Sequence, residues 1–164
     1  MLLPLTLGAA LAAPPVVEVR DGRVRGVVEV ARPPAEVRGL LADPVWVNRT
    51  DGSSTTVTGS RPDGDCLLAD YHSPSRLVSA TYTVRQCGTP TGWTQTLVRS
   101  DLLTAYETEW VVAPAGSGSR ISYSLRVEAP MLPTSWVLSM SQDGVTHMLG
   151  KLQQALGAPG APAP

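Results

Sequence analysis

The sequence predicts a single α+β domain in which a curved antiparallel β-sheet surrounds one long C-terminal α-helix. Between residues 54 and 128, apolar and polar side chains alternate with a period of two, in segments separated by short turn sequences. From about residue 133 onward, the apolar residues recur at helical spacing instead. A sheet with one apolar face must cover that face, and the terminal helix is the one large apolar partner that the pattern offers.

A strand and a helix are predicted near the N-terminus. Residues 23–32 alternate, and one face of this strand carries Val24, Gly26, Val28 and Val30. A helix is expected over residues 33–43, because proline is tolerated at a helix start. The Asp43-Pro44 pair ends this helix, since the residue before proline is pushed out of the helical region.

Six further strands are expected, at residues 54–60, 66–71, 76–86, 93–100, 104–113 and 120–128. Their connections are short, and short connections join antiparallel neighbours, so the sheet is predicted to be a meander. The last strand is the clearest case, because one of its faces carries Ile121, Tyr123, Leu125 and Val127.

The C-terminal helix is predicted over residues 133–156 and ends at Gly157. Gly144 lies near its middle, where glycine weakens a helix by about 1 kcal/mol relative to alanine. This position is expected to permit a bend or a close approach to the sheet. Residues 158–164 contain only Ala, Gly and Pro, so the tail is expected to be disordered.

Residues 1–13 are expected to form a signal peptide, which would place the mature protein in the periplasm or outside the cell. The segment is apolar and uncharged, is too short to span a bilayer, and contains the small-x-small pattern Ala10-Leu11-Ala12. No Lys or Arg precedes the apolar stretch. Either translation begins upstream of Met1, or the segment is not a signal.

Cys66 and Cys87 are the only cysteines, and they fall in expected neighbouring strands. A cross-strand disulfide is therefore predicted, with two unpaired thiols as the alternative. The two histidines, His72 and His147, stand alone without nearby ligands, so no metal site is expected.

The composition argues against several classes of function. The formal net charge is -1 and the chain has one lysine, so neither a nucleic-acid surface nor a basic membrane patch is expected. No catalytic or cofactor signature is present, so no cofactor is predicted and an enzyme is less expected than a binding protein. Ser122 and its neighbours lack the GxSxG context of a nucleophile elbow.

Aromatic and methionine side chains are the best candidates for a ligand site. Phe is absent, so large apolar surface must come from Tyr82, Trp93, Tyr106, Trp110, Tyr123 and Trp136, with Met140 and Met148 on the terminal helix. Ordinary core packing is the alternative for each of them. By alternation, Arg99 shares a strand face with Leu97, Gln95 and Trp93. It is predicted either to hold the polar head of a ligand or to cover the outer sheet with its stem.

Two segments carry a resemblance to a known family. The first is VEVARPPAEVRGLLADPVW at residues 28–46, and the second is WVVAPAGSGSRISYSLRVEAPMLPTSW at residues 110–136. They resemble the START/Bet v 1-like superfamily, which includes the SRPBCC and polyketide cyclase/dehydrase-like proteins. With the order of elements, the resemblance covers residues 20–157. It implies a helix-grip fold with a hydrophobic cavity for lipids, sterols, polyketides or similar molecules.

The leading functional hypothesis is an exported binding or carrier protein that holds a hydrophobic small molecule between the sheet and the terminal helix. One alternative is an enzyme of the polyketide cyclase/dehydratase type, which needs a shaped cavity and one or two acid–base groups. Another is a structural module of the cell envelope without a ligand. The sequence predicts neither the ligand nor the oligomeric state.

Overall fold

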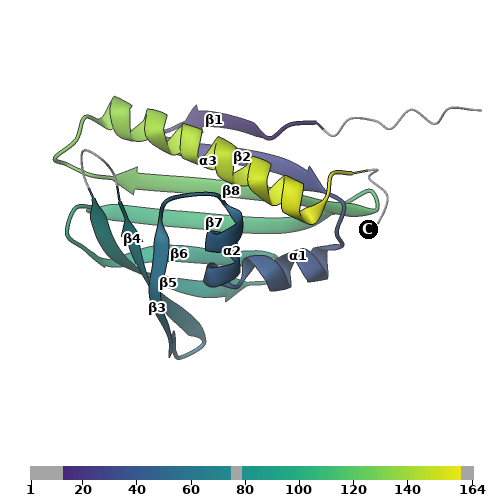
Figure 1. Cartoon of the computed structure of the whole chain (residues 1–164), viewed down its shortest axis with the longest axis horizontal. Helices are drawn as coiled ribbons and strands as arrows, with labels where there is room; N and C mark the ends of the chain where they lie inside the picture. Colours follow the sequence, from purple (N-terminus) through teal and green to yellow (C-terminus); the bar gives the residue numbers. More distant parts are fainter. Residues whose placement is uncertain (1–12, 75–78, 160–164) are drawn as a thin grey trace, which may run out of the picture.

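The computed structural model describes residues 13–74 and 79–159. An eight-stranded antiparallel sheet, in the order β1-β2-β8-β7-β6-β5-β4-β3, carries a long helix across one face (Figure 1). The strands are β1 (Val16–Arg20), β2 (Arg23–Val30), β3 (Thr56–Asp63), β4 (Cys66–Ser73), β5 (Ala80–Thr89), β6 (Gly92–Ser100), β7 (Ala105–Ala115) and β8 (Gly118–Glu128). The helices are α1 (Pro34–Leu41), α2 (Pro44–Thr50) and α3 (Thr134–Leu156). The predicted α+β fold class, with a meander and a terminal helix, is confirmed.

Three expectations fall wholly or partly outside the described residues. The predicted signal peptide lies there except for Ala13, and the predicted tail lies there from residue 160 onward. The strand predicted at residues 76–86 is present as β5, which begins at Ala80, and residues 76–78 of the prediction lie outside the described part. The signal peptide and the disordered tail stay predictions.

The main core lies where α3 rests on the N-terminal side of the sheet. Val145, Leu149, Leu152 and Leu156 are buried on the helix, and they face a sheet wall that includes Val24, Val28 and Ile121. Gly26 of β2 makes this contact possible: a Cβ at this position would lie 2.5 Å from Leu149 Cδ1. The close approach of helix and sheet therefore occurs at Gly26. A Cβ at Gly144, the residue expected to provide it, would meet nothing within 4 Å.

Strand β1 was not predicted, although its sequence carried a hairpin signal. It pairs with β2 through the turn Asp21-Gly22, where both residues have positive φ values of 52° and 71°. These angles belong to a type I′ turn, which favours Asp-Gly in two-residue hairpins. The strand adds an edge beside α3.

The second helix, α2, was also missed, because the Asp43-Pro44 pair was interpreted only as an end. The pair ends α1 and begins α2. The Asp43 carboxylate accepts a hydrogen bond of 2.8 Å from the Val45 amide, and Pro44 occupies the first helical position. The short helix thus turns back over the sheet, in front of strands that α3 does not cover (Figure 1).

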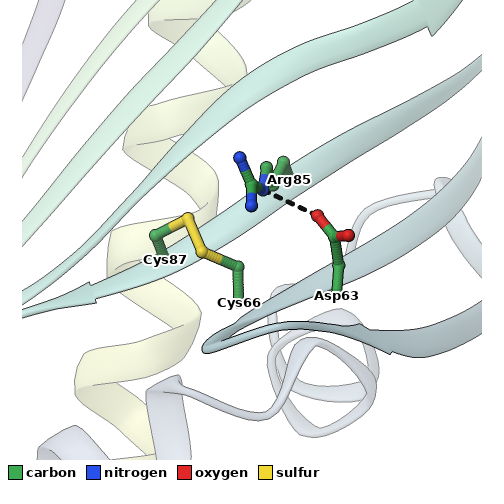
Figure 2. Close-up of a disulfide and its surroundings, with 4 residues drawn as sticks. All are labelled: Asp63, Cys66, Arg85 and Cys87. Atoms are coloured by element: carbon green, nitrogen blue, oxygen red, sulfur yellow. Dashed lines mark ion pairs between the residues drawn. A yellow bond between two sulfur atoms is a disulfide. The ribbon is translucent and has the colours of Figure 1, made fainter.

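The predicted disulfide between Cys66 and Cys87 is confirmed. The two residues are directly opposite in the β4–β5 register, with Cα atoms 4.4 Å apart and an S–S distance of 2.05 Å. Figure 2 shows the bond beside the ion pair between Arg85 and Asp63, in which Nε and Oδ2 are 2.7 Å apart. None of the helices in residues 13–74 and 79–159 has the length and hydrophobicity needed to cross a membrane.

Candidate ligand-binding cavity

A cavity of about 310 Å³ lies between the inner face of the sheet, α2 and the middle of α3. It forms because α3 packs mainly on β1, β2 and β8, and α1 on β7 and β8, so that neither helix packs closely on the inner face of β4 to β6. On the α3 side the lining residues are Ser141, Gly144, Val145 and Met148. The open space beside Gly144 is part of the cavity, since Gly144 lines it and a Cβ added there would have no atom within 4 Å.

All four tyrosines of the chain line this cavity, although they come from four different strands: Tyr71, Tyr82, Tyr106 and Tyr123. Sheet register brings them together. Tyr71 and Tyr82 are direct cross-strand partners, with ring centroids 5.3 Å apart. The centroids of Tyr82 and Tyr106 are also 5.3 Å apart.

Two tryptophans extend the aromatic wall. Trp93 and Trp110 are opposite each other on β6 and β7, with ring centroids 5.5 Å apart. Trp110 is in turn opposite Tyr123 of β8, at 4.5 Å. A continuous aromatic surface therefore crosses the inner face of the sheet from β4 to β8.

The phenol groups in this wall are neutral. Burial raises the pKa of Tyr82 and Tyr123 well above the ordinary value for tyrosine, and it raises the pKa of Tyr71 and Tyr106 as well. These side chains thus offer hydroxyl groups and apolar rings to a bound molecule, and they add no charge.

Two buried glutamines form a polar line across the floor of the cavity, and the sequence reasoning missed them. Thr108 Oγ1 donates to Gln95 Oε1 at 2.9 Å, and Gln95 Nε2 donates to Gln86 Oε1 at 2.9 Å. Gln86 Nε2 then donates to the carbonyl oxygen of Ala42 at 2.8 Å. The chain of bonds ties the α1–α2 junction to the sheet. The sequence contained a signal for them, because both glutamines fall at positions of β5 and β6 where the alternation places apolar, inward-facing side chains.

The segment after α2 supplies a polar rim. Asn48 holds this segment in place: its Nδ2 donates to the carbonyl oxygen of Thr55, and its Oδ1 accepts from the Val57 amide at 3.0 Å. Both ends of the Asn48 amide are therefore used within the fold.

Asp51, at the end of α2, lies in the same rim and was not among the predicted residues. Its Oδ1 accepts a hydrogen bond of 2.8 Å from the Ser53 amide. Burial raises the pKa of this carboxyl, while the hydrogen bonds with Ser53 and the nearby His147 lower it in part. No pattern in the sequence distinguishes Asp51 from other loop carboxylates.

Most of the predicted ligand residues come together in the structure. The main cavity is lined by Tyr82, Trp93, Tyr106, Trp110, Tyr123 and Met148. Trp136 and Met140 lie instead in an adjoining pocket of about 220 Å³, together with Leu102, Leu103 and Leu132. The two spaces share Tyr82 and Tyr106 as lining residues. That these side chains bind a ligand stays a prediction.

Arg99 does not reach either space. The β5–β6 register pairs Val84 with Leu97 but Thr83 with Arg99, so β6 contains one extra residue at Val98. This bulge moves Arg99 to the outer face. There its Nε donates to Thr83 Oγ1 at 3.0 Å, and its Nη2 lies 3.8 Å from Asp70 Oδ1. Of the two predicted roles for Arg99, the structure agrees with the one on the outer sheet.

The fold and the cavity together define a helix-grip protein with a partly enclosed space between its sheet and its terminal helix. Comparison with solved structures identifies the fold as START/Bet v 1-like, as the sequence resemblance implied. No family model matches the chain, and no curated protein matches it.

Three solved structures illustrate the likeness. The protein TTHA0849 from Thermus thermophilus has a TM-score of 0.70 and 19% identity, over 82% of this chain and 96% of that one. A START superfamily protein from Mycobacterium smegmatis has a TM-score of 0.65 and 18% identity, over 82% and 96%. The Zhui aromatase/cyclase from Streptomyces sp. R1128 has a TM-score of 0.63 and 12% identity, over 82% and 92%. At these identities the likeness establishes the fold.

Proposed function

We propose that the protein binds a hydrophobic small molecule in the cavity between the sheet and α3. The observation that carries this proposal is a space of about 310 Å³ with a continuous aromatic wall and polar groups gathered at its rim and floor, an arrangement typical of small-molecule sites. Among the described residues, every buried side-chain nitrogen or oxygen already has a hydrogen-bond partner. These buried polar atoms therefore need no partner from a ligand.

The proposal includes a location outside the cytoplasm. The Cys66–Cys87 disulfide supports it, because such bonds persist in oxidising compartments. The apolar N-terminal segment supports it independently, through its resemblance to a signal peptide. The protein would then hold its ligand in the periplasm or outside the cell.

An enzyme of the cyclase type is the second candidate, and Asp51 is the observation that favours it. A cavity carboxyl with a raised pKa is suited to acid–base work, and the Zhui aromatase/cyclase has the same fold. No hydrogen bond among the described residues joins Asp51 to a tyrosine hydroxyl as an acid–base pair would require. Binding is therefore the better-supported function.

The test uses a substitution that fills the cavity without disturbing the fold. Gly144→Trp adds a side chain to a lining position at which nothing lies within 4 Å. Gly150→Trp is the matched control, because it adds the same side chain to the same helix at a position that also has free space but does not line the cavity. Both proteins and the parent chain, expressed without residues 1–12, are compared by native and denaturing mass spectrometry, before and after incubation with decanol.

We expect the parent and Gly150→Trp to carry a non-covalent mass that extracts into organic solvent, and Gly144→Trp to lack it. Equal occupancy of the two variants would place the ligand elsewhere and refute the cavity. A parent chain that neither retains a molecule nor takes up decanol would refute the binding function itself.

A further inference from the structure

The charges around the cavity are distributed unevenly. Among the described residues that line it, Asp51 is the one side chain that carries a charge at neutral pH, since the others are apolar, amide, hydroxyl or neutral phenol groups. No arginine or lysine from the described segments joins that lining. On the outer face, by contrast, arginines pair with carboxylates. Arg23 and Arg126 both contact Glu107, and Arg61 contacts Asp70.

The position of Asp51 is built into the fold. Asn48 joins the end of α2 to β3 through both ends of its amide, and the Ser53 amide holds one carboxylate oxygen. Ser53 and Thr55 line the cavity beside it. A polar rim from α2 and the following segment thus faces an aromatic wall supplied by the sheet, and the cavity has two chemically different sides.

We propose that the cavity selects neutral or cationic amphiphiles, whose hydroxyl or amine group donates to Asp51 while the apolar part lies against the aromatic wall. Anionic amphiphiles such as fatty acids are disfavoured, because a second carboxylate would be placed near Asp51 without a cation from the lining between them. This selectivity rests on the proposed binding function and specifies its ligand class.

His147 and Lys151 are the neighbouring groups that must be controlled. Both lie beside the rim, since a Cβ at Gly52 would be 2.8 Å from His147 Nε2 and 3.4 Å from Lys151 Cε. A cation there would partly neutralise Asp51. Neither group differs between the parent chain and Asp51→Asn, so the comparison of these two chains at one pH reports the carboxylate itself.

The experiment compares decylamine, decanol and decanoate, which share one chain length and differ in head group. Binding at pH 8 is measured by titration calorimetry and by the fluorescence of the cavity tryptophans Trp93 and Trp110. The test variant is Asp51→Asn, which keeps an oxygen for the Ser53 amide and removes the charge. Asp65→Asn is the control, because it changes the net charge equally in the exposed turn between β3 and β4.

In the parent chain we expect decylamine to bind most tightly and decanoate least. Asp51→Asn should weaken decylamine binding about tenfold, as expected for the loss of one charge-assisted hydrogen bond at a half-buried site. It should strengthen decanoate binding and change decanol binding less than about threefold. Asp65→Asn should preserve the order of the parent chain.

Decanoate binding as tight as that of decylamine, or unchanged affinities in Asp51→Asn, would overturn the selectivity. If decanol still binds and Gly144→Trp still blocks it, the proposed binding function survives that result. If none of the three amphiphiles binds, the binding function and the selectivity fail together.

Discussion

The disulfide offers a prediction whose size follows from the topology. Replacing both Cys66 and Cys87 by alanine releases a loop with a sequence separation of 21 residues. In the chain-entropy model, closing a loop of this length stabilises the folded state by about 3 kcal/mol. The entropy of unfolding of a domain this size is about 0.3 kcal/mol/K, so the double substitution should lower Tm by about 10 °C.

The assay is thermal unfolding followed by circular dichroism at pH 7, for the parent and the doubly substituted chain, each with and without a thiol reductant. Reductant should bring the parent close to the double variant, and it should leave the double variant unchanged. A Tm difference below about 2 °C between parent and variant would refute the reasoning, because the bond would then not constrain the unfolded chain.

Three further predictions concern single residues. Gly26→Val should lower the free energy of unfolding by about 1–3 kcal/mol in urea titrations, because its side chain would overlap Leu149, whereas Gly144→Ala, with free space, should not destabilise the fold. Asp51→Asn should raise Tm at pH 7. Burial raises the pKa of Asp51 in the folded chain, so Asp51 ionises less readily there than in the unfolded chain. Ionised Asp51 therefore lowers the free energy of unfolding at any pH above the raised pKa. This destabilisation disappears as the pH falls through the raised pKa toward 3.8, the ordinary value. A Tm difference that grows on acidification would contradict the assigned burial of Asp51. Arg99→Ala should leave decanol affinity within about twofold of the parent, because Arg99 lies on the outer face, and a large loss measured by calorimetry would contradict that placement.

The elements with regular alternation were predictable from the sequence. The inner face of β8 and the apolar side of α3 follow from periods of two and of about 3.6, and the structure confirms both. The disulfide was also predictable, because it required only that β4 and β5 be neighbours. In each case one local pattern was sufficient.

Arg99 illustrates what a local pattern cannot predict. Alternation counted from Trp93 places Arg99 on the inner face, and the count is correct as far as Leu97. The extra residue at Val98 then exchanges the inner and outer faces for the residues that follow it. No residue type in that segment indicates a bulge. The polar rim escaped prediction for a related reason, since the segment that carries Asp51 is held against the sheet by the tertiary hydrogen bonds of Asn48.

The same packing geometry explains both the cavity and the position of the disulfide. The main core cluster draws its residues from β2, β6, β7, β8, α1 and α3, and within the described chain it includes none from β3, β4 or β5. Those three strands extend beyond the reach of α3 (Figure 1). Filling the cavity with packed side chains would stabilise this part of the sheet but would remove the space for a ligand.

The Cys66–Cys87 disulfide stabilises this part of the sheet without filling the cavity, because it joins β4 and β5 on the face opposite the cavity. It stabilises the strands that carry Tyr71 and Tyr82 by restricting the unfolded chain, and it takes up no volume inside the cavity. Reduction of the bond should therefore loosen the aromatic wall more than the α3 core. Hydrogen exchange of the β4 and β5 amides should accelerate on reduction, while the amides of β2 and β8 should keep their protection.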